Sequence, residues 1–327
     1  MLEITPSNIR QWSRFGSRAV YGQALLDVAK DFPNVVALSA DLGNSSGLDR
    51  FKATFPERFV NVGIAEQNLI GVAAGIAKEG FNAFASSFAP FITMRASEQI
   101  RMNLGYMELN VKAVGIGSGL VMGFLGNSHF GLEDVAVTRA IPNLTIVSPA
   151  DCTEIVKVVR AAAEFEGPMY IRLTGGPNNP PAYQGDYDLT IGQSIQMRDG
   201  KDVAIAATGS MVAASISAAT LLQSDGISTA VYNFHTLKPI DQDCLLHMGG
   251  HYKSIFAVEE HSVVGGLFSA ITETLASNPQ RPPIHPVGLP DSFGKTADYG
   301  VLLERYGLTP EGIRARILSE FASDKIA

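Results

Sequence analysis

Short strand-like runs alternate with segments of helical periodicity along most of the chain, and this alternation constrains the fold more than any other feature of the sequence. The predicted strands are residues 35–39, 59–62, 83–86, 111–116, 145–148, 169–173, 203–207, 228–233 and 254–258. The predicted helices are residues 17–30, 66–77, 88–103, 133–140, 152–164, 212–222, 265–276 and a last one that begins at Pro310, with Thr309 as N-cap. Because helices that alternate with strands cover both faces of mostly parallel sheets, we expect an α/β fold of doubly wound, mostly parallel sheets.

Two domains are expected. The chain has 327 residues, which is enough for roughly two domains of ordinary size. Residues 175–183 are rich in proline, glycine and asparagine, and the alternation of strands and helices resumes after them. We therefore expect a first domain at residues 1–190 and a second at residues 191–327, with an interdomain linker at about residues 175–200.

The composition is apolar and acidic. Hydrophobic residues make up 46% of the chain and charged residues 17%, so we expect buried subunit interfaces as well as cores. The net charge of −7 and the lack of a Lys/Arg cluster argue against nucleic acid and membrane surfaces as partners.

No apolar run reaches the ~20 residues of a membrane span, and the first residues do not resemble a signal peptide, so we expect a cytoplasmic protein. Cys152 and Cys244 lack the spacing of a disulfide framework or a zinc site.

One carboxylate lies between a strand and an apolar helix. The β-branched and aromatic residues 59–62 stop at Gly63, and from Glu66 onward apolar residues recur at spacings of three and four. An ionisable group in the first turn of so apolar a helix is either a solvated helix cap or a buried functional acid. Glu66 is therefore the first candidate for a catalytic residue.

Two glycine-containing loops follow predicted strands, and the first of them is polar and lies where α/β sheets bind ligands. Residues 40–47 contain Asp41 and Ser45, and the loop at residues 117–129 ends in His129.

Six motifs occur in order along the chain. They are Val-Gly-Ile-Ala-Glu-Gln-Asn at residues 62–68, Phe-Ala-Pro-Phe-Ile-Thr-Met at 88–94, Gly-Asn-Ser-His at 126–129, Pro-Ala-Asp at 149–151, Val-Glu-Glu-His at 258–261 and Gly-Leu-Pro-Asp-Ser-Phe-Gly at 288–294. Together they resemble the C-terminal half of a transketolase, over nearly the whole chain. The resemblance implies a pyrimidine-binding domain followed by a transketolase C-terminal domain, with thiamine diphosphate as cofactor.

The resemblance also implies roles for individual residues. Glu66 would hydrogen-bond the pyrimidine of thiamine diphosphate and so generate the base that the thiazolium carbon acid requires. His129 would lie near the thiazolium ring and the substrate hydroxyls, as a donor or proton shuttle. Further contacts to the cofactor would come from Phe88, Phe91, Met94 and Asp41. The alternatives are a solvated cap for Glu66, plain core packing for the apolar set, a loop histidine without a role and a turn aspartate.

Half of the expected cofactor site is missing from the sequence. Thiamine diphosphate enzymes hold the diphosphate and its metal with a Gly-Asp-Gly turn followed by Asn, and no Gly-Asp-Gly occurs here. The resemblance therefore implies a second subunit that carries the Gly-Asp-Gly…Asn domain and holds the diphosphate with Mg²⁺ (or Ca²⁺ or Mn²⁺). This chain would supply no metal ligand, and two copies of each chain would form a heterotetramer.

The substrate-binding set differs from that of transketolases. Arg18 and Ser45 stand where transketolases bind sugar phosphate, and Arg172 fills the first place of a common Arg-x-x-Arg pattern. In an ungapped comparison, three other polar positions of that family are replaced by Leu125, Gly117 and Gly175. We therefore expect sugar or sugar-phosphate substrates that are not ordinary pentose phosphates.

The expected function is that of one subunit of a two-chain transketolase-like transferase. It would move a two-carbon ketol (glycolaldehyde) unit from a ketose donor to an aldose acceptor, and only together with its partner. One alternative is the beta subunit of a 2-oxo acid dehydrogenase or an enzyme like deoxyxylulose phosphate synthase, although the Gly-Asn-Ser-His turn favours transketolase. The other alternative is a non-catalytic regulatory or scaffold subunit.

Overall fold

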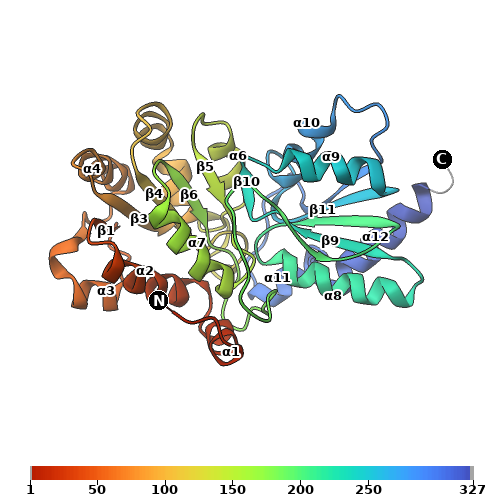
Figure 1. Ribbon diagram of the computed structural model, residues 1–327, viewed down its shortest axis with the longest axis horizontal. Coiled ribbons are helices and arrows are strands. Elements are labelled where there is room, and N and C mark those ends of the chain that lie inside the picture. Colours follow the sequence, from red (N-terminus) through yellow and green to blue (C-terminus); the bar gives the residue numbers. More distant parts are fainter. Residues whose placement is uncertain (1, 325–327) are drawn as a thin grey trace.

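Two sheets lie side by side in the computed structural model, which describes residues 2–324 (Figure 1). The first sheet has seven strands in the order β10-β5-β6-β4-β3-β1-β2, and the second has five in the order β12-β11-β8-β9-β7. Only β10 and β7 run antiparallel to their neighbours in these two sheets. The prediction of an α/β fold with mostly parallel sheets is confirmed.

The bounds of the strands are β1 (Val35–Ser39), β2 (Phe59–Asn61), β3 (Asn82–Phe88), β4 (Val111–Ile116), β5 (Thr145–Val147), β6 (Met169–Arg172), β7 (Ile195–Arg198), β8 (Val203–Ala207), β9 (Thr229–Asn233), β10 (Thr236–Lys238), β11 (Ser254–Ser262) and β12 (Ile284–Leu289). Those of the α-helices are α1 (Pro6–Phe15), α2 (Ser17–Asp31), α3 (Asp49–Thr54), α4 (Glu66–Lys78), α5 (Ser97–Gln99), α6 (Asp134–Arg139), α7 (Cys152–Glu164), α8 (Met211–Ser224), α9 (Gln242–His251), α10 (Leu267–Leu275), α11 (Tyr299–Arg305) and α12 (Pro310–Asp324). Helix α12 begins as predicted, because the Thr309 hydroxyl accepts a hydrogen bond from Gly312 N at 3.2 Å.

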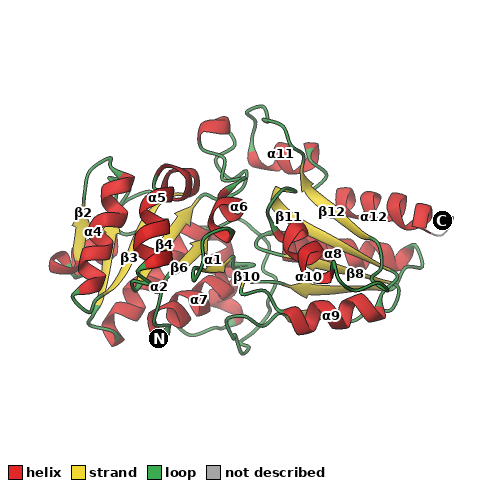
Figure 2. Ribbon diagram, turned by 90° about the horizontal axis from the view of Figure 1, so that it is seen from above, coloured by secondary structure: helices red, strands yellow, loops and turns green. Residues whose placement is uncertain are grey.

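Each sheet is covered by helices on both faces. In the first sheet, α4 packs its apolar residues on one face, while α2 and α7 cover the other. In the second sheet, α9 and α10 cover one face and α8 and α12 the other (Figure 2). Strands β1, β3 and β4 are buried along their whole length, as expected for strands of a parallel sheet that is covered on both faces. None of the helices in the described part of the chain is both long and apolar enough to span a membrane.

The prediction of a helix at residues 88–103 is confirmed only in part, because Phe88 ends strand β3 and the helical residues after it are mostly π-helical. Strand β3 continues to Phe88 because it pairs with β4 as far as the Phe88 and Ile116 positions. Pro90 follows, and it cannot donate a backbone hydrogen bond to extend the ladder. The chain then forms a π-helical turn η2 (Phe91–Arg95), the short α5 and a second π-helical segment η3 (Ile100–Tyr106).

The two halves of the chain are joined by more than a linker. Strand β10, from the second half, pairs with β5 and so extends the first sheet. The ammonium group of Lys238 at its end donates to the carbonyl oxygen of Arg139 at 2.9 Å and also to that of Ile141. These contacts tie the second half of the chain to the edge of the first sheet.

A buried carboxylate fixes the segment between β6 and β7. Glu154 on α7 accepts hydrogen bonds from the hydroxyls of Tyr183 and Tyr187 at 3.1 and 2.9 Å, and from the amide of Asn233 at 3.0 Å. The two tyrosine rings stack with their centroids 3.8 Å apart. Burial raises the pKa of Glu154, and the hydrogen bonds it accepts favour the charged form. Glu154 therefore connects helix α7, the linker and strand β9.

Removing this carboxylate tests the connection. Glu154→Ala is expected to lower the free energy of unfolding by about 3 kcal/mol, because two tyrosine hydroxyls and an asparagine amide lose a buried acceptor. Chemical denaturation of the purified chain measures the change. The matched control is Glu164→Ala at the end of the same helix, where an exposed ion pair with Arg160 contributes about 0.5 kcal/mol or less. Equal effects of the two substitutions would contradict the connecting role of Glu154.

Candidate active site

Glu66 is held at the carboxyl edge of the first sheet by a sharp turn. Strand β2 ends at Asn61, and Gly63 takes a φ of 75° before α4 begins at Glu66. The side-chain oxygen of Asn61 accepts from Gly63 N at 3.1 Å and from Asp41 N at 2.9 Å. The turn before Glu66 and the loop after β1 are thus fixed to the same amide group.

The Glu66 side chain is buried and paired. It is 3% exposed, and its Oε2 accepts a hydrogen bond from Nη1 of Arg95 at 2.8 Å. Arg95 is half exposed, and its guanidinium carbon lies 4.3 Å from the ring centroid of Phe91. The N-terminal end of α4 adds a favourable dipole for the negative charge. A buried carboxylate therefore pairs with an arginine that is half exposed to solvent.

Aromatic rings from two segments meet beside this pair. Phe88 is the last residue of β3, Phe91 opens η2, and their ring centroids are 5.9 Å apart. The imidazole of His129 lies 5.5 Å from the ring of Phe88 and 5.0 Å from that of Phe91, in edge-to-face geometry. The structure therefore brings together Glu66, Phe88, Phe91 and His129, which lie far apart in the sequence.

His129 follows a short 3₁₀ turn, η4 (Gly126–Ser128). Its Nδ1 lies 2.9 Å from the Ser128 hydroxyl, and Asn127 anchors the turn by exchanging two hydrogen bonds with the main chain of Gly294. Burial, with a smaller effect from the charge of Arg95, lowers the pKa of His129 below its ordinary value. The ring is therefore neutral at pH 7 and can donate or accept one hydrogen bond at Nε2.

The other predicted site residues lie on several different elements. Asp41 is exposed at the end of β1, with a φ of 60°, and its Oδ1 accepts from the Asn61 amide at 3.2 Å. Met94 is 47% exposed and adjoins Arg95 in η2. Arg18 and Ser45 are in contact, because Nη1 of Arg18 donates to the Ser45 carbonyl oxygen at 3.3 Å.

Arg172 is placed between the two halves of the molecule. Its side chain is 1% exposed, and its Nε donates to Asp134 at 2.8 Å. Its Nη2 donates to the carbonyl oxygens of Gly131 and Glu260, both at 2.9 Å. The buried guanidinium of Arg172 thus binds main-chain carbonyl groups from both halves of the chain.

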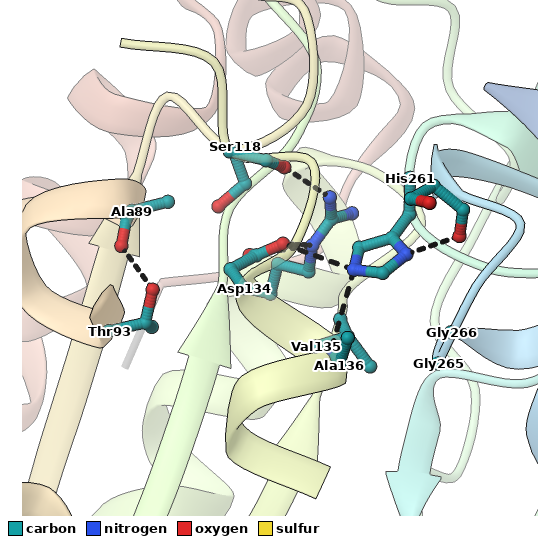
Figure 3. Close-up of polar contacts among 12 residues, drawn as sticks. Ala89, Thr93, Ser118, Asp134, Val135, Ala136, His261, Gly265 and Gly266 are labelled. Atoms are coloured by element: carbon teal, nitrogen blue, oxygen red, sulfur yellow. Dashed lines mark hydrogen bonds and ion pairs between the residues drawn. The ribbon is translucent and has the colours of Figure 1, made fainter. Parts of the chain in front are cut away.

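A histidine of the second half completes this buried network. The Nε2 of His261 lies 3.7 Å from Asp134 and accepts from Ala136 N at 3.4 Å, while Nδ1 faces the Ser262 carbonyl oxygen at 2.6 Å (Figure 3). Burial lowers the pKa of His261 to about 4, so the ring is neutral at pH 7. This arrangement joins α6 to β11 and explains why Arg172 is a poor candidate for contact with a substrate.

Arg95 was not expected from the sequence. Its position four residues after Phe91 is the spacing at which two side chains on a helix meet, and this was the available signal. The π-helical turn that directs it toward Glu66 has no comparable signature in the sequence.

Large apolar side chains are exposed on the segments that carry or anchor the site residues. Ile64 is 80% exposed, Phe124 is 68% exposed, and Phe293, which precedes the Asn127 partner Gly294, is 86% exposed. We call Ile64, Met94, Phe124, Leu125 and Phe293 the apolar rim. Exposed apolar residues of this size are typical of surfaces that another protein covers.

The residues present fit one half of a thiamine diphosphate site. The carboxylate of Glu66 can bind a ring nitrogen, and Phe88, Phe91 and His129 form a wall suited to a flat heterocycle. No cluster of three or more His, Cys, Asp or Glu side chains able to hold a metal occurs within residues 2–324. The chemistry of this donor set is that of the pyrimidine half.

Comparisons with known proteins identify two domain families in the chain. Residues 14–176 match the pyrimidine-binding domain of transketolase, and residues 192–313 match the transketolase C-terminal domain. A solved structure described as a split gene transketolase, inactive beta4 tetramer, superposes with a TM-score of 0.83 and 39% sequence identity, covering 93% of this chain and 97% of that one.

Two curated relatives extend the comparison. The 6-deoxy-6-sulfo-D-fructose transketolase subunit SqwH of Clostridium sp. (strain MSTE9) is 38% identical over 296 residues, which is 90% of this chain and 91% of that subunit. The 1-deoxy-D-xylulose-5-phosphate synthase of Pelotomaculum thermopropionicum is 34% identical over 93% of this chain, but the match spans only 48% of that enzyme. Since both domain families match in order, and the split gene transketolase and SqwH are each covered almost end to end, the chain belongs to the transketolase family of thiamine diphosphate-dependent transferases.

Proposed function

We propose that this chain is the pyrimidine-binding subunit of a two-chain transketolase-like enzyme that transfers a two-carbon ketol unit from a ketose to an aldose. The observation that carries the proposal is the buried carboxylate of Glu66, whose half-exposed partner Arg95 stacks on Phe91 beside Phe88 and His129. A solvated helix cap would not be 3% exposed, and a plain core residue would not pair with a half-exposed arginine.

The chain's own residues prepare the site for the reaction. Thiamine diphosphate would supply an acidic thiazolium carbon and an electron sink for cleavage of the ketose carbon–carbon bond. Glu66 holds a proton on the pyrimidine nitrogen, because a buried carboxylate favours a positively charged partner. Phe88 and Phe91 exclude water from that contact, and His129 Nε2 exchanges a hydrogen bond with a substrate hydroxyl.

A second subunit completes the site. The sequence contains no Gly-Asp-Gly turn, and we assign the diphosphate and its Mg²⁺ (or Ca²⁺ or Mn²⁺) to the partner chain. The apolar rim provides a surface for that partner, and the solved relative is itself described as a split gene transketolase. The assembly we propose contains two copies of each chain.

The substrate is a sugar or sugar phosphate that differs from ordinary pentose phosphates. Arg18 and Ser45 provide a polar pair. Near Phe88, the buried Gly117 offers no side chain, and a Cβ built there would lie 3.0 Å from the Cγ of Met122, so the surroundings of this position are apolar. A relative that acts as a subunit of a sulfofructose transketolase supports a modified sugar.

Replacing Glu66 tests catalysis by this chain. In the complex of this chain with its natural partner, Glu66→Gln is expected to lower kcat about 10²–10⁴-fold, because the amide carries no charge to stabilise the protonated pyrimidine. Steady-state assays of ketol transfer measure the change. Glu79→Gln, at the exposed opposite end of α4, is the matched control and should leave kcat within about twofold. Unchanged activity of Glu66→Gln would favour the regulatory or scaffold alternative.

A donor panel separates the two enzymatic alternatives. We expect hydroxypyruvate with a set of phosphorylated, deoxy and sulfonated aldoses to give ketol transfer, with product identified by mass spectrometry. Pyruvate with glyceraldehyde phosphate or lipoamide should give no product, because a ketol donor must carry a hydroxyl that His129 can bind. The reverse preference, for pyruvate over hydroxypyruvate, would favour the alternative of a 2-oxo acid dehydrogenase beta subunit or an enzyme like deoxyxylulose phosphate synthase.

A further inference from the structure

Arg95 contacts three features of the candidate site at once. Its Nη1 donates to Oε2 of Glu66 at 2.8 Å, and its guanidinium stacks on the ring of Phe91. Its carbonyl oxygen accepts from the side-chain amide of Gln67 at 3.3 Å. The first turn of α4 and the end of η2 are therefore joined by one residue.

The π-helical turn explains how Arg95 reaches Glu66. Thr93 is buried beneath the turn, and its hydroxyl donates to the carbonyl oxygen of Ala89 at 2.7 Å (Figure 3). Ile92 is also buried, whereas Met94 points outward. This anchoring leaves Phe91 and Arg95 on the side that faces the site. Single π-helical turns of this kind occur frequently at functional sites.

The geometry leaves one oxygen of Glu66 for a ligand. Arg95 occupies Oε2, and no other side chain among residues 2–324 donates a hydrogen bond to the Glu66 carboxylate. A buried carboxylate with one fixed oxygen can rotate little, so Oε1 has a defined direction. The Arg95 guanidinium also gives the buried Glu66 side chain a hydrogen-bonding partner of opposite charge, without which burial of a carboxylate is strongly unfavourable.

We propose that Arg95 is a positioning residue, which fixes Glu66 so that Oε1 meets the ring nitrogen of the cofactor's pyrimidine. This inference rests on the proposed function, because it assumes that Glu66 binds the pyrimidine. Arg95 stacks on the ring of Phe91 and pairs with the carboxylate of Glu66. It therefore fixes the position of this carboxylate relative to the Phe91 ring. Its role is to preorganise the pyrimidine half of the site before the cofactor arrives.

The first test is cofactor affinity. The tagged chain is purified from its own cells with its natural partner, stripped of cofactor with EDTA, and titrated calorimetrically with thiamine diphosphate and Mg²⁺. Arg95→Gln is expected to raise the dissociation constant about tenfold or more, and Arg95→Lys to recover part of the loss. Arg281→Gln, at an exposed position of the second half, is the control and should bind like the wild type.

A double-mutant cycle with Glu66→Gln distinguishes positioning from a structural role. If Arg95 acts through the Glu66 carboxylate, Arg95→Gln should change the dissociation constant less than about twofold when residue 66 is already Gln. A full, additive loss in both backgrounds would contradict the proposal. Should Arg95→Gln fail to assemble, Arg95→Met keeps the stem over Phe91 and carries the same comparison.

The outcomes separate this inference from the proposed function. If the wild-type complex binds thiamine diphosphate and Arg95→Gln binds it equally well, the inference is wrong and the proposed function stands. If the wild-type complex does not bind thiamine diphosphate, the proposed function fails and the inference fails with it.

Discussion

A carboxylate buried at the start of an apolar helix requires a positive partner, and the Glu66–Arg95 pair meets this requirement. The rest of the first sheet serves to bring these two residues together. Strand β2 and its glycine turn place Glu66, while the end of β3 and the π-helical turn place Arg95 and the aromatic rings. The pair lies at the carboxyl edge of a parallel sheet, the usual location for ligands in this architecture.

Buried polar contacts and strand pairing join the two halves of the chain. Arg172, Asp134 and His261 form a buried network between them, and β10 extends the first sheet from the second half. The hydrogen bonds between Asn127 and Gly294 connect the loop of His129 to the second half in the same way. The position of the imidazole thus depends on both domains, which gives the C-terminal domain a part in shaping the site.

Most strands and helices could be predicted, because short apolar runs and apolar residues at spacings of three and four are local signals in the sequence. It also identified Glu66, since an acid in an apolar helix start stands out, and the structure buries it as that reasoning required. Arg95 was missed because the π-helical turn changes the helical register. A regular α-helix at residues 88–103 would have directed this side chain away from Glu66. The burial of Arg172 depends on Asp134 and Glu260, which are distant in the chain, so no local pattern could indicate it.

The central claim is that this chain holds one half of a cofactor site and that another chain holds the rest. Equilibrium dialysis of labelled thiamine diphosphate with Mg²⁺ against this chain, its co-purifying partner and their mixture tests the claim directly. We expect saturable binding in the mixture, with about one cofactor for each pair of chains, and no saturable binding to this chain alone. Saturable, metal-dependent binding to this chain alone, with an affinity that the partner does not change, would contradict the account.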